Sequence, residues 1–466
     1  MKPRTTLVLL VLALALGAVV FFWERKLPGT SEIAERANHL LPDVAADDVT
    51  RLTLVRPAGR LVAERDGEGW RLSEPVRDRA DVFAVKGLIE QVIEARVASR
   101  LPAAEIQGGD KATGLAEPQL KVVLATAAGE STVALGAEAP GGLRYARSGT
   151  GGEIALVDAA LAEQLERPAA ELRDHGLFDL STTDVGKFTV EREGRREFAF
   201  ERRDGESWWI VQPIQDAAAD SEVTGALSRV LAIRAAEFLD QPPPAIDLGL
   251  DPPRFAVRLV RAGKDEPAGA LLVGNPSGEG SARRYARAEG RDALVTIDAA
   301  EMLRDWDKEA TAWRSTLALD FSAWDVTDVE LERDGTTVRF AREGQGEPDD
   351  TWKLRAPDGF PFDAAQARDV VSNLGRVEAR RLVDDLTPAA AGLERPAARF
   401  AVTLKVADQP PRRQELVIGG PAGEGEVYAR RTGRTPLLVI DAETARMIDP
   451  ARLQPARPPA GDTPKE

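Results

Sequence analysis

Apolar and polar residues alternate in three separate stretches of the chain, and each stretch begins at an Asp-Val pair: Asp48-Val49, Asp184-Val185 and Asp328-Val329. In the first stretch Leu52 and Leu54 fall on one face of an extended strand, because successive side chains point to opposite faces. Each stretch then changes to the spacing of an amphipathic helix, after an aspartate in the N-cap position: Asp81, Asp220 and Asp363. The pattern therefore predicts strands followed by a helix, three times over.

Rare residues mark equivalent positions in the three stretches. A Trp-x-aliphatic-x-x-Pro motif ends the predicted third strand each time, at Trp70 and Pro75, Trp208 and Pro213, and Trp352 and Pro357. The only three tyrosines of the chain follow the tryptophans by 75, 77 and 76 residues, at Tyr145, Tyr285 and Tyr428. Recurrence at this regularity indicates one structural unit written three times.

Between the helix and the tyrosine, each unit repeats a Gly-Leu-x-x-Pro motif, at Gly114, Gly249 and Gly392, and then further alternating segments. The predicted order is βββα-ββββ-α in about 130 residues, a length that can bury its own core. We therefore expect an α+β protein of three tandem repeats, each with a largely antiparallel sheet and packed helices. The predicted repeats are residues 48–180, 184–320 and 328–449, and the proline-rich residues 450–466 are predicted to be a disordered tail.

The N-terminal segment has the composition of a membrane anchor. After a short basic N-terminus at residues 1–6, which is predicted to be cytoplasmic, residues 7–23 form an uninterrupted apolar run that ends in Phe21, Phe22 and Trp23. A cleaved signal peptide is the alternative, but the apolar run continues past the small residues around Gly17, which favours a retained transmembrane helix. Residues 24–47 are then a tether, and we expect the rest of the chain outside the bacterial cytoplasmic membrane, in the periplasm or at the outer surface.

Composition narrows the possible chemistry. The chain has no cysteine and only two histidines, His39 and His175, in different segments, so we predict no metal site and no cofactor. The formal net charge of −15 is dispersed and disfavours nucleic-acid binding. The glycine-rich loops after residues 136, 274 and 419 lead into strands rather than helices, so they are predicted hairpin loops and not phosphate cradles.

The best polar candidate is the Tyr-Ala-Arg motif, in which tyrosine and arginine share one strand face. These side chains could bind a carboxylate or a sugar, and the candidate ligand or partner contacts are Tyr145, Arg147, Tyr285, Arg287, Tyr428 and Arg430. The simpler interpretation is that the tyrosines pack at the core edge while the arginines pair with acidic neighbours. The Trp and Pro markers are predicted to be structural.

The anchor and the ordered, threefold motifs resemble the bacterial DUF4340 family, a domain of unknown function. The resemblance covers residues 7 to about 450 and implies a non-enzymatic, membrane-anchored envelope protein of the kind encoded beside ABC-transporter components. The third repeat departs from the pattern, with Val427 where the other two have arginine.

The leading hypothesis is therefore a scaffolding or accessory component of an ABC-type transport complex, with protein partners in the membrane. One alternative is a module that binds envelope glycan or a small anion through the Tyr-Ala-Arg strands. Another is an envelope hydrolase with an unrecognised carboxylate pair, which a deep pocket lined by close carboxylates in a single repeat would favour.

Overall fold

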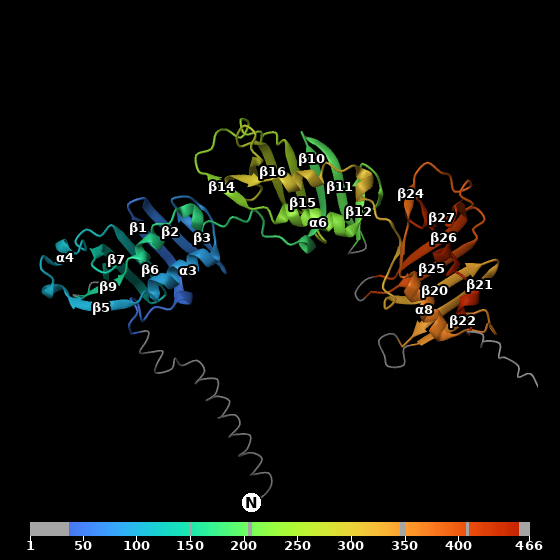
Figure 1. Cartoon of the computed structure of the whole chain (residues 1–466), viewed down its shortest axis with the longest axis horizontal. Coiled ribbons are helices and arrows are strands. Elements are labelled where there is room, and N and C mark those ends of the chain that lie inside the picture. Colours follow the sequence, from blue (N-terminus) through green and yellow to red (C-terminus); the bar gives the residue numbers. More distant parts are fainter. Residues whose placement is uncertain are drawn as a thin grey trace, which may run out of the picture. The chain divides into compact units, whose positions relative to one another are not determined.

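The computed structural model describes residues 37–149, 151, 153–203, 207–344, 351–406 and 410–455. Within these ranges the chain is mostly β with a few helices, and it contains three large antiparallel sheets, one for each repeat (Figure 1). Short hairpins build most of each sheet, as the alternating sequence pattern predicts.

The first sheet has the strand order β4-β3-β2-β1-β6-β7-β8-β9-β5. Its strands are β1 (Val49–Arg56), β2 (Gly59–Asp66), β3 (Gly69–Glu74), β4 (Asp78–Ala80), β5 (Val97–Pro102), β6 (Leu120–Thr126), β7 (Gly129–Ala139), β8 (Leu143–Ser148) and β9 (Glu153–Asp158). The helices of this repeat are α3 (Val82–Ile93), α4 (Gly109–Ala112) and α5 (Ala160–Leu165), with 3-10 turns η1 (Ala46–Asp48), η2 (Ala103–Glu105) and η3 (Ala169–Leu172).

The second sheet repeats this order as β13-β12-β11-β10-β15-β16-β17-β18-β14. Its strands are β10 (Val185–Arg192), β11 (Arg195–Arg203), β12 (Ser207–Gln212), β13 (Asp216–Ala217), β14 (Ala235–Leu239), β15 (Phe255–Arg261), β16 (Pro267–Pro276), β17 (Arg283–Ala288) and β18 (Leu294–Asp298). The accompanying helices are α6 (Asp220–Leu231) and α7 (Ala300–Asp305), with 3-10 turns η4 (Thr182–Asp184) and η5 (Ala310–Trp313).

The third sheet has the order β22-β21-β20-β25-β26-β27-β28-β24. Its strands are β20 (Val326–Arg333), β21 (Thr336–Glu343), β22 (Thr351–Ala356), β24 (Arg381–Val383), β25 (Ala398–Leu404), β26 (Arg412–Gly423), β27 (Glu426–Arg431) and β28 (Leu437–Asp441). A separate ribbon pairs β19 (Leu317–Asp320) with β23 (Arg376–Glu378), and the helical elements are α8 (Ala364–Leu374), α9 (Ala442–Arg446) and η6 (Pro450–Leu453).

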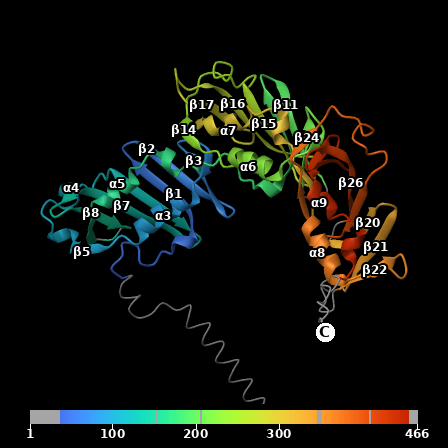
Figure 2. The same ribbon diagram turned by 45° about the vertical axis from the view of Figure 1, so that its right-hand side comes forward.

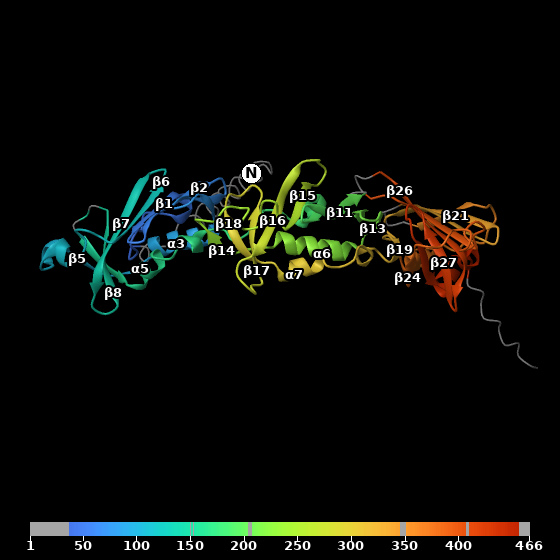
Figure 3. The same ribbon diagram turned by 90° about the horizontal axis from the view of Figure 1, so that it is seen from above.

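The long helices α3, α6 and α8 lie against one face of their own sheets (Figures 2 and 3). In the first repeat, Val85, Ile89 and Val92 of α3 are buried against the strand residues Leu52 and Leu72. The third repeat buries the equivalent face of α8 in the same way. Trp70, Trp208 and Trp352 are all buried, and the peptide bonds before Pro75, Pro213 and Pro357 are cis.

The aliphatic-glycine motifs have a steric cause. A Cβ on Gly136 would lie 2.1 Å from the carbonyl oxygen of Thr113, and Gly274 and Gly419 meet equivalent carbonyls at 2.1 and 2.2 Å. In the first repeat, Ala137 N donates to Thr113 O at 2.7 Å, which ties the Gly-Leu-x-x-Pro loop to the strand. Glycine is therefore required wherever the loop crosses the strand this closely.

The structure corrects several sequence-based expectations. Asp81 and Asp363 cap their helices as predicted, but Ala219 is the N-cap residue of α6 and Asp220 stands one position inside the helix. The predicted order omits β4, β5 and their equivalents, because β4 and β13 have three and two residues and β5 has no buried face to produce an alternating pattern. The predicted tail begins too early, since Leu453 of η6 is buried in the third core.

The predicted anchor, residues 7–23, lies outside the described residues, as does most of the tether. No helix within the described ranges is long and apolar enough to cross a membrane. The described chain divides into two compact units. One contains the first sheet with residues 234–242 and 290–297, and the other contains residues 178–233, 243–289 and those from 298 onward.

Candidate functional site

Each compact unit contains one buried aspartate that is held by two arginines. Asp78 begins β4 and Asp216 begins β13, eight residues after the marker tryptophans Trp70 and Trp208. Both aspartates are buried, with exposed fractions of 5% and 0%. A buried carboxylate is costly unless it is paired and hydrogen-bonded, so the surroundings of these two residues decide whether the fold tolerates them.

The first junction cluster consists of Asp78, Arg173, Arg291 and Asp240. Arg173 donates from Nε and Nη2 to Asp78 Oδ2 at 2.8 and 2.7 Å. Arg291 donates from Nε to Oδ1 and from Nη2 to Oδ2 of the same carboxylate, both at 2.8 Å. Arg173 Nη1 reaches the half-exposed Asp240 at 2.6 Å, so two aspartates balance two arginines.

The second junction cluster, Asp216, Arg314, Arg434 and Asp384, repeats this arrangement. Arg314 Nε donates to Asp216 Oδ2 at 2.8 Å, and Arg434 donates from Nε and Nη2 to the two carboxylate oxygens at 2.9 and 3.0 Å. Arg314 also binds both oxygens of the half-exposed Asp384, at 2.7 and 2.6 Å. Paired donation from a planar guanidinium fixes direction as well as distance.

The remaining arginine donors also have equivalent acceptors in the two clusters. Arg291 donates to the carbonyl oxygens of Asp174 and Gly176, at 2.6 and 2.8 Å. The equivalent Arg434 donates to those of Ser315 and Leu317, at 2.8 and 3.0 Å. The two clusters are therefore structurally equivalent in both their ion pairs and their contacts with backbone carbonyl oxygens.

The clusters connect consecutive repeats along the chain. Asp78 and Arg173 come from the first repeat, whereas Arg291 lies in the turn between β17 and β18 of the second. A backbone bond accompanies each cluster: Ala235 N donates to His175 O, and Ala379 N donates to Thr316 O, both at 2.7 Å. In the first cluster the Phe238 ring also lies 3.7 Å below the Arg173 guanidinium.

Burial and ion pairing act in opposite directions on these carboxyls. Burial of Asp78 favours its neutral form, but hydrogen bonds and charge from Arg291 and then Arg173 outweigh burial and lower the pKa of Asp78. The hydrogen bond from Arg314 likewise lowers the pKa of Asp384. Both carboxyls are therefore held in the ionised form that the arginines require.

A cavity of about 300 Å³ adjoins the second cluster and is lined in part by Asp220, Asp320 and Arg314. Asp220 accepts the Trp208 backbone N–H at 2.5 Å, and burial, with a further contribution from the charge of Asp320, raises the pKa of Asp220. The first and third repeats have Val82 and Ala364 at the position of Asp220. Of the three repeats, only the second therefore has a carboxylate at this position.

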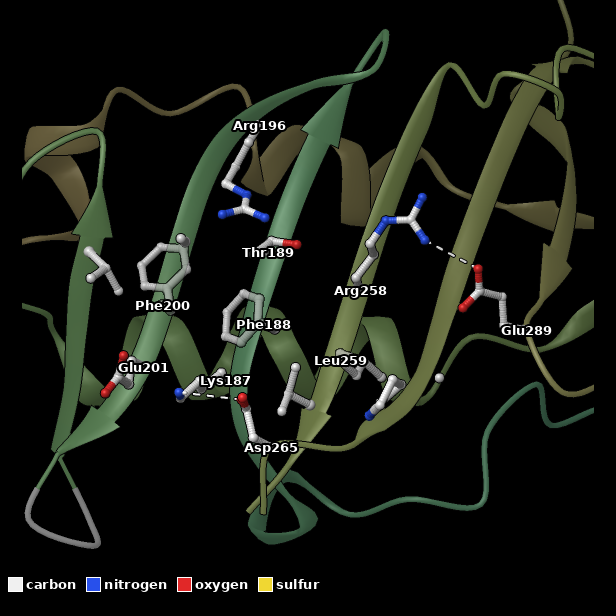
Figure 4. A pocket seen from close by; sticks show the side chains of 15 residues that line it. Lys187, Phe188, Thr189, Arg196, Phe200, Glu201, Arg258, Leu259, Asp265 and Glu289 are labelled. Atoms are coloured by element: carbon white, nitrogen blue, oxygen red, sulfur yellow. Dashed lines mark hydrogen bonds and ion pairs between the residues drawn. The ribbon is translucent and has the colours of Figure 1, made fainter. Parts of the chain in front are cut away.

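A larger hollow of about 510 Å³ lies on the face of the second sheet opposite α6 (Figure 4). Lys187 pairs with Asp265 at 3.7 Å and Arg258 with Glu289 at 3.2 Å, so these charged groups on the surface neutralise one another. No group of histidine, aspartate and glutamate side chains suited to a metal ion occurs in the described part of the chain.

The predicted Tyr-Ala-Arg contacts have different surroundings in the three repeats. Arg147 donates to both oxygens of Asp110, at 2.7 Å from Nη1, and this hydrogen bond raises the pKa of Arg147. The hydroxyl of Tyr285 donates to Ser277 O at 3.4 Å, and Tyr428 packs on a small apolar cluster that includes Leu393. The side chains of Arg287 and Arg430 form no hydrogen bond or ion pair with other described residues, although both backbones pair within their sheets. Tyr285 and Tyr428 belong to the same compact unit but contact different residues, Ser277 and the apolar cluster around Leu393 respectively.

A family model described as Domain of unknown function (DUF4340) matches the chain in three overlapping segments, residues 70–247, 208–396 and 352–454. Each segment begins at a marker tryptophan, and the first two continue into the following repeat beyond Asp240 and Asp384. Both of these segments therefore include most of a junction cluster. No curated protein matches the chain.

Proposed function

The chain belongs to the DUF4340 family, and from that premise we propose that it is a non-enzymatic scaffolding or accessory component of an ABC-type transport complex. In this proposal the apolar residues 7–23, which lie outside the described residues, anchor the chain in the bacterial cytoplasmic membrane, and its α+β repeats lie on the outer side. The resemblance of the chain to envelope proteins encoded beside transporter components supports this class of partner.

The observation that carries the proposal is the pair of junction clusters. Each cluster joins residues of two consecutive repeats by buried, directional ion pairs, and such contacts suit a scaffolding chain. The four charged side chains of each cluster form ion pairs with one another, which supports a role in assembly rather than in catalysis.

The test is in-cell crosslinking of the full chain, followed by detergent solubilisation, capture and identification of the recovered proteins. The wild-type chain is expected to recover a permease or ATPase subunit of an ABC-type system. The variant Asp216→Asn should recover less of it at equal abundance in the membrane. Asp66→Asn, which breaks an exposed pair with Arg71, is the matched control and should behave as wild type. Recovery of no membrane protein by the wild-type chain would contradict the proposal.

The carboxylate-pair alternative has one specific observation in its favour, the cavity that Asp220 and Asp320 line. If the chain were a hydrolase, Asp320→Asn would abolish turnover of an envelope glycan or peptide without changing partner recovery. Equal and negligible turnover by wild type and variant would remove this alternative.

A further inference from the structure

The outer faces are the side of the first repeat that corresponds to Asp240 and Arg291 and the side of the third repeat that corresponds to Asp78 and Arg173. Both lack every residue of the junction clusters. In the third repeat, the position eight residues after the marker tryptophan is Phe360 in place of Asp78 and Asp216. The backbone bond from Asp363 N to Leu453 O corresponds to those that precede Arg173 and Arg314 in the first two repeats, so Gln454 takes the arginine position.

The first repeat lacks the opposite half. Arg291 and Arg434 each follow their motif tyrosine by six residues, and the residue six after Tyr145 is Gly151. Asp240 lies five residues after the start of β14, and the residue five after the start of β5 is Pro102. All four cluster positions are thus occupied at the internal junctions and replaced at both ends.

This distribution matters because the interface is head-to-tail. One face supplies an aspartate and an arginine, and the other face supplies their complements, so the contact is not self-complementary. Between copies of a chain, a heterologous contact of this kind closes into a ring or continues as an open filament unless the terminal faces differ from the internal ones. Repeat proteins require modified terminal units for the same reason.

We infer that the outer faces of the array are blunted against a second copy of the chain, and that the four cluster positions decide which repeat faces associate. Phe360 packs partly against the third core, and the exposed Gln454 carries no charge. Gly151 has no side chain and Pro102 has no carboxylate. Each replacement removes a group that a neighbouring chain would need.

The inference is tested by restoring the missing halves in two differently tagged full-length chains in detergent. One chain carries Phe360→Asp and Gln454→Arg, and the other carries Pro102→Asp and Gly151→Arg. We expect co-capture of this mixture to exceed that of two wild-type chains at least tenfold. The matched control replaces Phe360→Asp with Phe360→Asn and should lose most of this gain. The arginine introduced for Gly151 then lacks a carboxylate, and the arginine introduced for Gln454 keeps only the aspartate introduced for Pro102.

A restored pair that folds, by circular dichroism, and yet associates no better than wild type would overturn the inference. A second measurement avoids any change to the outer faces. In Asp216→Asn, amide hydrogen exchange at Ala379 should accelerate at least tenfold, while Ala235 at the first junction serves as an unchanged reference in the same molecule. Asp78→Asn should do the reverse. Equal protection of both amides in both variants would show that the clusters do not decide association.

Discussion

Replacing Asp216 by asparagine keeps the shape of the side chain but removes the charge that neutralises two arginines. Arg314 retains Asp384, but Arg434, whose side chain is 1% exposed, loses its carboxylate partner and keeps neutral acceptors, among them the carbonyl oxygens of Ser315 and Leu317. Breaking a buried ion pair by removing one partner costs about 3–5 kcal/mol. Since two carbonyl acceptors remain, we expect a loss near the lower limit, about 3 kcal/mol, in the unfolding free energy of the second compact unit.

The assay is urea unfolding of the full chain, followed by fluorescence of the buried tryptophans and by amide exchange of the second unit. Asp384→Asn is the matched control, because this half-exposed carboxylate pairs with the same Arg314 and its loss should cost under about 1 kcal/mol. Adding Arg434→Met to Asp216→Asn should recover part of the loss by removing the unpaired charge. An Asp216→Asn loss no greater than that of Asp384→Asn would refute the reasoning.

Three further predictions concern titration and the tyrosines. Because its folded-state pKa is raised, Asp220 contributes stability below its unfolded pKa of about 3.9 that is lost as pH rises. Asp220→Asn should therefore be at least as stable as wild type at pH 7, with a gap that narrows toward pH 4 in urea titrations; a less stable variant at pH 7 would contradict this. The lowered pKa of Asp78 has the opposite sign, so its contribution is present above about pH 4 and lost in acid, and Asp78→Asn should flatten the acid limb of stability against pH. Replacing all three motif tyrosines by phenylalanine should preserve the fold by circular dichroism and, if the ligand-binding alternative holds, reduce binding of glycan or anion at least tenfold; unchanged binding would exclude that alternative. The substitutions are Tyr145→Phe, Tyr285→Phe and Tyr428→Phe.

The sheet hairpins and the long helices could be predicted because their burial alternates with the period of the element. Val85, Leu88 and Ile89 recur with helical spacing, and the structure buries them all. The elements that were missed have no such period. The sequence pattern predicts Asp220 as a cap, but Asp220 lies twelve residues after Trp208, whereas Asp81 lies eleven residues after Trp70. Register within the repeat, rather than local composition, decides the cap.

The junction clusters could not be found from local patterns, because their members lie far apart along the chain. Arg291 and Asp78 are separated by 213 residues, and Asp78 and Arg173 by 95. A signal was nevertheless present in the repeat alignment. The cluster positions hold Asp, Asp and Phe in one column and Gly, Arg and Arg in another. At each of these positions the residue is charged where the repeat meets a neighbouring repeat and uncharged where it does not. Such a distribution indicates an interface between repeats.

An apolar junction of similar size would have avoided the desolvation cost of burying two arginines and an aspartate. The stability of an apolar junction would also not depend on the orientation of the two repeats, since the hydrophobic effect scales with buried area and has no preferred direction. A carboxylate gripped by two planar guanidinium groups accepts a single arrangement, and the half-exposed Asp240 and Asp384 keep each cluster neutral at modest cost. The polar clusters therefore specify which face of one repeat contacts which face of the next. Three similar repeats on one chain need this specificity more than additional stability, because their faces otherwise resemble one another.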